Sequence, residues 1–216
     1  MATSAAQGLD GRQSRTARSR LAICEACLDL VQEGALQPSA DQIAERAGLS
    51  RRSIFNHFAD LGELYDAVVE VGMQRCVPLL EKVSEDAPVS SRVERLAEAR
   101  TRFLEATASF TRALTAQALV GPAAEQALRV SRDALRLHHQ DVERLFAREL
   151  TALSPPERAE VLEALAAAMS PLQWEYLRRS RGNSMSRARA VMKRTLTSIL
   201  RDAGVDVGVR EPGGRS

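Results

Sequence analysis

The sequence predicts an all-α protein in which a helix-turn-helix head near the N-terminus is joined to a larger helical body. Hydrophobic residues make up 44% of the 216 residues, whereas aromatic residues make up only 4%. Alanine, leucine, arginine and glutamate dominate, and all four favour helices. Clusters of β-branched residues and runs that alternate apolar and polar residues are scarce, so the chain offers little material for a sheet.

Composition also narrows the class of protein. No run approaches the roughly 18 consecutive apolar residues that a membrane span needs, and the N-terminus lacks the apolar core of a secretory signal. Three cysteines do not make a disulfide framework in a chain of this length, and Cys24 and Cys27 are expected to be buried thiols on one helix. These features predict a cytoplasmic protein without a membrane partner.

Start and stop signals for helices recur along the chain. The predicted helices of the head are Arg12 or Arg15 to Glu33, a short helix from the N-cap Ser39 to Gly48, and a short helix from the N-cap Ser50 to Phe58. A longer helix from Leu61 to Pro78 is expected to open the body. The predicted helices of the body carry the apolar stripes Val89–Phe103, Leu128–Leu153, Leu162–Tyr176 and Ala188–Ala203. The expected segments are therefore a disordered tail at 1–11, a helix-turn-helix domain at 12–60, a helical domain at 61–205, and a second disordered tail at 206–216.

The segment from Ser39 to Phe58 carries the functional signal. Two helices of about two turns each, joined by a short turn that contains glycine, form the helix-turn-helix unit. Ala44 is small enough for the helices to cross closely, and Gly48 supplies the turn. Ile43, Leu49 and Ile54 are expected to fill the wedge between the two helices.

The second helix of this motif is rich in hydrogen-bond donors and contains no acid. It should expose Arg51, Arg52, Ser53, Asn56 and His57. Arginine reads guanine through two hydrogen bonds in the major groove, and asparagine reads adenine, while serine and histidine suit phosphates. An ordinary helical hairpin with a solvated polar face is the alternative. The acid-free, arginine-rich stretch upstream, which includes Arg18, favours DNA.

At this point the chain resembles the tetracycline-repressor (TetR) family of bacterial regulators. The resemblance rests on Arg20–Ile23 through Gly34, on Ile43–Ala44, on Ala47–Arg51, on Ile54–Phe58 and on Glu63–Leu64. It implies a chain of nine helices with three in the head, and a homodimer that binds a palindromic double-stranded DNA operator. It also implies that residues 61–205 bind a small-molecule effector and dimerise. The candidate DNA contacts are then Arg18, Ser39, Ser50, Arg51, Arg52, Ser53, Asn56 and His57.

Two positions depart from the pattern that the resemblance implies. The family usually has a tyrosine where Phe55 stands, and Phe55 has no hydroxyl to reach a phosphate. The family usually opens its fourth helix with a lysine, where this chain has Leu61. The arginine-rich arm could compensate by contacting phosphates or the minor groove, or it could be a tail that never touches DNA.

A protein that reads two half-sites needs a stable two-fold interface. The last two helices are the expected interface, since each has an apolar stripe of the width used in four-helix packing. The candidate residues are Leu165, Met169, Leu172, Met192, Leu196 and Ile199. The alternative is a monomer whose last helices bury only each other. Arg187, Arg194 and Arg201 recur every seven residues on the last helix and are expected to form a solvated face, or else to rim the interface or attract an acidic ligand.

An effector cavity would lie among the middle helices, and its apolar surroundings suggest a hydrophobic or aromatic effector. By residue type, the candidates for its lining are Phe103, Phe110, Gln117, His138, His139, Trp174 and Tyr176. His138 and His139 straddle the stripe between Leu135 and Val142, so at least one of them should face inward.

No catalytic motif is present, and the three histidines are not spaced as metal ligands, so we expect no enzyme, no cofactor and no metal. The leading hypothesis is a ligand-responsive repressor. One alternative is a helical carrier or sensor of small molecules with a vestigial head. Another is an architectural DNA binder without an effector.

Overall fold

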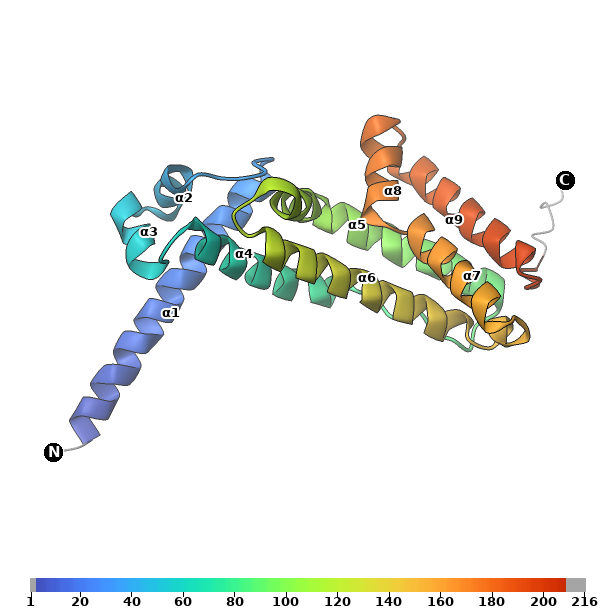
Figure 1. Ribbon diagram of the computed structural model, residues 1–216, viewed down its shortest axis with the longest axis horizontal. Helices are drawn as coiled ribbons and strands as arrows, with labels where there is room; N and C mark the ends of the chain where they lie inside the picture. The colour runs from blue at the N-terminus through green and yellow to red at the C-terminus, as the bar shows by residue number, and fades with distance from the viewer. Residues whose placement is uncertain (1–2, 209–216) are drawn as a thin grey trace, which may run out of the picture. The chain divides into compact units, whose positions relative to one another are not determined.

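The computed structural model describes the backbone of residues 3–208 and the side chains of residues 15–208. Within this range all regular structure is helical, which confirms the all-α prediction and the count of nine α-helices (Figure 1). The helices are α1 (Thr3–Gln32), α2 (Ala40–Ala47), α3 (Arg51–His57), α4 (Leu61–Cys76), α5 (Val89–Val120), α6 (Ala124–Phe146), α7 (Pro155–Ala168), α8 (Pro171–Glu175) and α9 (Met185–Asp202).

The chain divides into two compact units. The first unit contains the residues up to Pro78 together with Ser109–Ser131, and the second contains Leu79–Ala108 together with the chain from Arg132 onward. Helices α5 and α6 each contribute one part to each unit.

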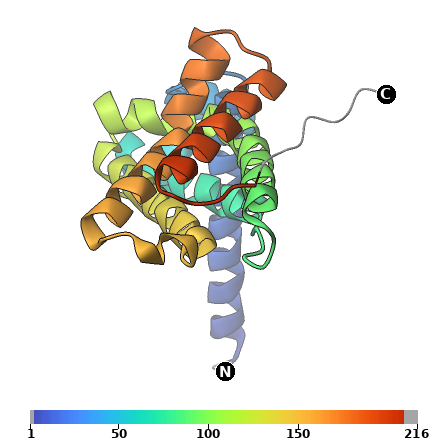
Figure 2. The same ribbon diagram turned by 90° about the vertical axis from the view of Figure 1, so that its right-hand side faces the viewer.

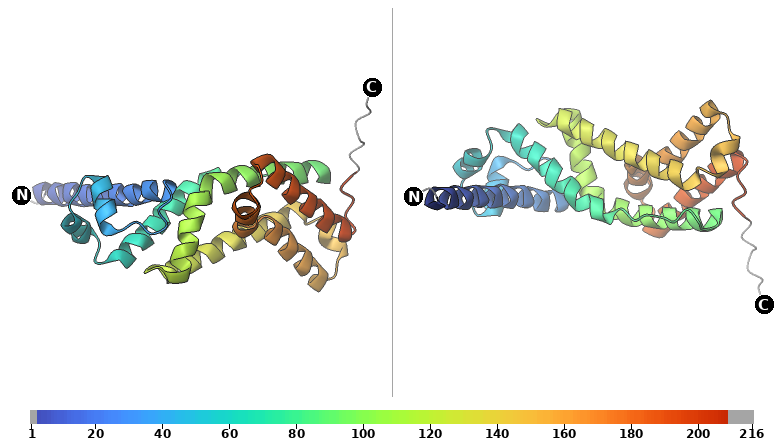
Figure 3. Two further views of the ribbon diagram at one scale, coloured as in Figure 1. Left: turned by 90° about the horizontal axis from the view of Figure 1, so that it is seen from above. Right: turned by 90° about the horizontal axis from the view of Figure 1, so that it is seen from below.

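In the first unit, α2 and α3 lie against α1, and α4 packs on α1 as well (Figures 1 and 3). The core contains the α1 residues Ile23 and Cys27, both fully buried, which pack with Ile43 of α2 and Ile54 of α3. Burial raises the pKa of the Cys24 thiol to about 11, so this cysteine is protonated and unreactive at neutral pH, as expected of a packing residue.

The second unit has its own core, which α5, α6, α7 and α9 share. Helices α7 and α9 lie side by side, as the orange and red ribbons of Figure 2 show. Trp174 is 1% exposed, and its indole Nε1 donates to Glu105 Oε1 at 2.8 Å. Glu105 also forms an ion pair with Arg178. The polar atom of the buried Trp174 therefore has a hydrogen-bond partner at the edge of this core.

The prediction of one continuous helix that carries Leu162–Tyr176 is wrong. The segment is broken into α7 and α8, because Ser170 accepts a hydrogen bond from Gln173 N at 3.2 Å and Pro171 occupies the first position of the new helix. A proline inside one continuous helix would remove a hydrogen bond and clash with the preceding turn. As a result, Leu172 and Tyr176 are 72% and 51% exposed.

The ends of the described chain also differ from the expected helix bounds. α1 begins at Thr3, before the predicted start at Arg12, and ends at Gln32, next to the predicted Glu33. Beyond α9, Val205 and Val207 are buried in the core of the second unit. The rest of the predicted C-terminal tail, residues 209–216, lies outside the described residues.

No helix in the described part of the chain is both long and apolar enough to cross a bilayer. Among the same residues, no three histidine, cysteine or acidic side chains come together as a metal site would require.

Candidate nucleic-acid interface

Serine residues cap the N-termini of α2 and α3, the two helices of the predicted helix-turn-helix motif (the reading head). Ser39 Oγ accepts from Gln42 N at 3.3 Å, and the Gln42 side chain accepts from Ser39 N at 2.8 Å, which completes a capping box at α2. Ser50 Oγ accepts from Ser53 N at 3.2 Å and caps α3. Both predicted N-caps are confirmed.

The turn between α2 and α3 is made as predicted at Gly48, which has φ +66° and donates back to the end of α2. Ile43, Ala44 and Ile54 are buried between the helices, as expected. The expectation for Leu49 is wrong. Its backbone N–H donates to Ala44 O at 2.8 Å and completes the turn, but its side chain is 38% exposed.

Arg52 and Asn56 stand out on the surface of α3. They are four residues apart and therefore lie on one side of the helix. Both side chains are exposed, and neither makes a hydrogen bond or ion pair with another described residue. A guanidinium and a carboxamide that are free on one helix face can form paired hydrogen bonds with base edges.

Arg51 is oriented differently from Arg52. Its Nη1 lies 2.8 Å from Asp41 Oδ2 of α2, and its guanidinium lies 5.7 Å from the centre of the Phe55 ring. Both side chains of the ion pair are at least 60% exposed, so the pair contributes little to stability and does not hold Arg51 firmly. Phe55, which departs from the family's tyrosine, thus contacts the arginine beside it.

Ser53 and His57 are less available than the sequence indicates. Ser53 is half-buried, and its Oγ lies 2.9 Å from Ser50 Oγ. His57 is also half-buried, and its Nδ1 is inaccessible to solvent and has no partner in the described chain. Of the predicted contacts on α3, Arg51, Arg52 and Asn56 are exposed, and among these Arg52 and Asn56 have no partner in the described chain.

Arg20 is the residue that sequence reasoning about the site missed. From α1 it donates to the backbone carbonyl of His57, pairs with Glu63 Oε1 at 2.9 Å, and places its guanidinium 4.1 Å from the centre of the Phe58 ring. It therefore links the end of α3 and the first turn of α4 to α1. Arg20 was used in the sequence analysis only as part of the segment that carries the family resemblance and was given no role at the site.

Replacing Arg20 with methionine should lower the stability of the end of α3 by about 1.5–3 kcal/mol, because a charge-assisted hydrogen bond to its last carbonyl is lost. The measurement is hydrogen exchange of the α3 and α4 amides. Arg75→Met is the matched control, since Arg75 pairs with Glu25 of α1 in an exposed ion pair. Equal exchange in the two variants would show that Arg20 does not fix α3.

The arm and the first turn of α4 flank this surface. Arg18 is exposed on α1 and already takes part in an interaction with another residue. Leu61 is half-buried and packs on the core of the first unit, which explains why an apolar residue stands where the family has a lysine. Asp60 caps α4 by accepting from Glu63 N at 2.9 Å, so this turn is acidic.

The predicted dimer residues lie mostly inside the second unit. Leu165, Met169, Met192 and Leu196 are at most 2% exposed and fill the core of a single chain. Ile199 packs against the same core and is only partly exposed. Among the six candidates, Leu172 alone is largely exposed, and Tyr176 lies one helical turn further along.

The predicted effector residues divide between two small cavities. Phe103 and His138 line a cavity of about 30 Å³ in the second unit, and Phe110 and Gln117 line one of about 20 Å³ in the first. His139 and Trp174 line neither cavity. His139 lies 3.9 Å from Glu163 at the surface, and Trp174 is buried elsewhere in the second unit. His138 is therefore the histidine that faces inward.

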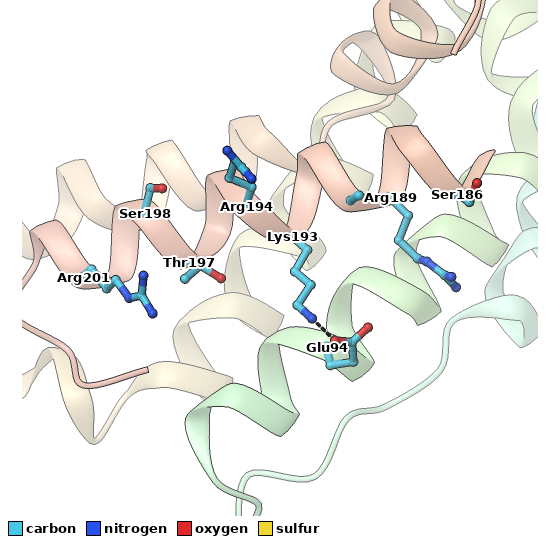
Figure 4. Close-up of a pocket in the computed structure, with 9 residues that line it drawn as sticks. Glu94, Ser186, Arg189, Lys193, Arg194, Thr197, Ser198 and Arg201 are labelled. Carbon is cyan, nitrogen blue, oxygen red and sulfur yellow. Dashed lines mark hydrogen bonds and ion pairs between the residues drawn. The ribbon is translucent and has the colours of Figure 1, made fainter. Parts of the chain in front are cut away.

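A basic groove of about 590 Å³ runs along α9 and reaches Glu94 of α5 (Figure 4). Arg189 and Lys193 lie on the side that faces Glu94, and Lys193 forms an ion pair with it. Arg187, Arg194 and Arg201 are all exposed to solvent, consistent with the predicted solvated face.

The chain is similar to solved structures but matches no sequence family. Neither a protein-family model nor a curated protein sequence matches this chain. Three solved structures are similar over 87% of it. A TetR-family transcriptional regulator from Streptomyces coelicolor, 82% of which is covered, has a TM-score of 0.66 at 14% identity. A transcriptional regulator from Rhodococcus sp. Rha1, 96% of which is covered, has a TM-score of 0.61 at 16% identity.

The third structure, from Mesorhizobium loti and provisionally designated a TetR-family transcriptional regulator, has a TM-score of 0.53 at 18% identity, and 98% of it is covered. At identities this low the similarity is one of backbone architecture. The order of the helices and the capped reading head agree with the resemblance that the head motifs carry in the sequence. The chain has the fold of the TetR-family transcriptional regulators.

Proposed function

We propose that this protein is a sequence-specific DNA-binding transcriptional regulator that acts as a homodimer on a palindromic operator. The observation that carries the proposal is α3, whose accessible face presents Arg52 and Asn56 and whose seven residues include no acid. A short helix of this kind fits the major groove of B-form DNA, where arginine and asparagine discriminate guanine and adenine. The solved structures of the same fold that are described as transcriptional regulators support the proposal.

We propose a repressor that a small hydrophobic or aromatic effector releases from DNA. The internal cavity of the second unit, where His138 has unpaired nitrogens, supports a site for such an effector. The exposed Leu172 and Tyr176 would give a second copy an apolar contact next to α9.

Selection from a random pool of DNA duplexes tests the proposal. A dimer should enrich a palindrome whose half-sites are about 10 base pairs apart, or a multiple of that distance. The mass of the complex in solution should correspond to two chains on one duplex. No enrichment would favour the carrier with a vestigial head, and a preference for AT-rich DNA without a palindrome would favour an architectural binder.

Arg52→Ala should cost about 1–3 kcal/mol of binding free energy at one base pair of each half-site, because a bidentate contact with a base is lost. The measurement is the affinity for the enriched site and for its single-base variants at fixed salt. Arg132→Ala is the control, since Arg132 is also exposed but lies on α6. An equal loss on every sequence would make Arg52 a phosphate contact, and no loss would remove α3 from the groove.

A further inference from the structure

One residue that lines the cavity of the second unit, Arg100, carries a buried positive charge. Arg100, on α5, is 6% exposed, and its Nε donates to Met169 O at 3.1 Å. A guanidinium has five N–H donors, and this bond is the one hydrogen bond that Arg100 makes with the described residues. Burial lowers the pKa of Arg100 to about 9, which still leaves it positively charged at neutral pH.

A histidine with two unpaired nitrogens faces the same space. Neither Nδ1 nor Nε2 of His138 is accessible to solvent, and neither has a hydrogen-bond partner in the described chain. Burial, and then the positive charge of Arg100, lower the pKa of His138 to about 3. The ring is therefore neutral at physiological pH and offers one donor and one acceptor. Each buried polar atom left without a partner costs free energy.

The carboxylates at the edge of this cavity do not neutralise Arg100 at ion-pair distance. Asp141 accepts from Arg144 at 2.8 Å, and Glu81 accepts from Arg102 at 2.6 and 2.9 Å. The negative charge of Asp141 acts on Arg100 only at longer range, where it partly offsets the effect of burial on the pKa of Arg100.

Apolar side chains form the other walls of the cavity. The Phe103 ring lies 5.1 Å from the Arg100 guanidinium and 5.8 Å from the His138 ring, which meets it edge-on. Leu96, Val142 and Met169 complete the lining, and Leu80 closes it from a segment outside the α-helices, with 38% of its surface exposed. The volume of about 30 Å³ holds a group about the size of a carboxylate. A larger body would have to displace Leu80.

We propose that this cavity binds the carboxylate of a small organic acid, with the guanidinium of Arg100 and the ring N–H of His138 as donors, while the hydrocarbon part of the ligand displaces Leu80 and packs on the apolar walls. The role of this acid as the effector rests on the proposed function, whereas its binding does not. The planar fork of arginine matches a carboxylate with two parallel hydrogen bonds, so a monocarboxylate is favoured over a neutral ligand of the same shape.

Calorimetric titration of the full-length protein without DNA tests the binding. Benzoate and hexanoate are the probes, benzamide and hexanamide are their neutral counterparts, and inorganic sulfate separates carboxylate recognition from general anion binding. At least one carboxylate should bind ten times more tightly than its amide and than sulfate. If ordered water alone satisfies Arg100 and His138, the carboxylates will not exceed the amides, and the inference fails.

Arg100→Met distinguishes a binding residue from a structural one. It keeps the length of the side chain but removes the charge, so carboxylate binding should weaken at least tenfold while the free protein stays folded, even if the lost hydrogen bond to Met169 O lowers its melting temperature. Arg95→Met, at an exposed position of the same helix, should change neither. The three histidines give few ring signals in nuclear magnetic resonance, and the signal of His138 should shift on addition of the carboxylate. Unchanged affinity in Arg100→Met, or an unmoved His138 signal, would overturn the proposal.

The two proposals can fail separately. A protein that selects a palindrome but binds no carboxylate would retain its function as a regulator and lose this inference. A protein that binds the carboxylate through Arg100 but enriches no DNA would keep the site and lose the proposed function. Release of the enriched duplex by the acid in the parent, but not in Arg100→Met, would identify the acid as the effector.

Discussion

Replacing Arg92 with methionine should lower the free energy of unfolding of the second unit by about 3–5 kcal/mol, because it leaves a partly buried carboxylate without its partner. The Arg92 side chain is 5% exposed and donates to both carboxylate oxygens of Glu149 and to the backbone carbonyl of Leu145. The hydrogen bonds from Arg92 hold the pKa of Glu149 below its usual value, so the carboxylate is charged at neutral pH. Urea denaturation followed by the fluorescence of Trp174, the single tryptophan, measures the loss.

A matched ion pair on the same helix controls for this experiment. Arg102 also makes two hydrogen bonds to one glutamate, Glu81, but both side chains are more than half exposed. Arg102→Met should therefore cost less than about 1 kcal/mol. Combining Arg92→Met with Glu149→Leu should recover most of the loss, because the pair is replaced by apolar groups. A cost for Arg92→Met no larger than that of Arg102→Met would show that burial of this pair has no special effect.

Replacing Gly72 with alanine should destabilise the first unit by about 1–3 kcal/mol, although alanine is the better helix former. A Cβ at this position of α4 would lie 2.2 Å from Cε2 of Phe110 and within 2.8 Å of two further ring atoms. These distances are far below van der Waals contact, so the ring or the helix must move. The free energy of opening of the α4 amides, obtained by hydrogen exchange, measures the effect.

The background variant Phe110→Leu separates the close contact from helix propensity. With the far ring atoms removed, Gly72→Ala should become neutral or stabilise α4 by about 0.5–1 kcal/mol, as propensity alone predicts. If Gly72→Ala stabilises the protein that still has Phe110, the close approach of the two residues is not a constraint on packing.

The reading head could be predicted from the sequence because its signals are local. The caps at Ser39 and Ser50 and the left-handed turn at Gly48 each depend on residues within about four positions, and all three are confirmed. The direction of the Leu49 side chain was predicted wrongly, since it depends on the path of the chain after the turn.

Apolar periodicity was less reliable in the body. The three-four spacing from Leu162 to Tyr176 continues across the break between α7 and α8, so the pattern hides two helices. Ser170 followed by Pro171 was the available signal, and it repeats the Ser154-Pro155 start of α7. Spacing also cannot say whether a stripe meets its own chain or a second copy, which is why most of the expected dimer residues were found in the core.

The cavity was only half predictable. Phe103 and His138 were chosen by residue type, but Arg100 was not, because an arginine on a helix is usually solvated. Its signal was its place on the stripe of Leu96 and Leu104, where an apolar residue is expected. The separation of Phe110 and Gln117 from this set arises because α5 divides its length between two units, which no local pattern records.

That division of α5 has a practical consequence for building chimeric proteins of this fold. The hydrophobic core around α4 also contains Leu114 of α5 and the buried residues Ala123 and Ala127. All three come well after α4 in the sequence. Splicing a foreign N-terminal segment onto this protein at residue 60 or 78 would therefore replace only part of a hydrophobic core and leave mismatched apolar surfaces. Under the proposed function, an exchange of DNA specificity is better made by transplanting the exposed side chains of α3 alone.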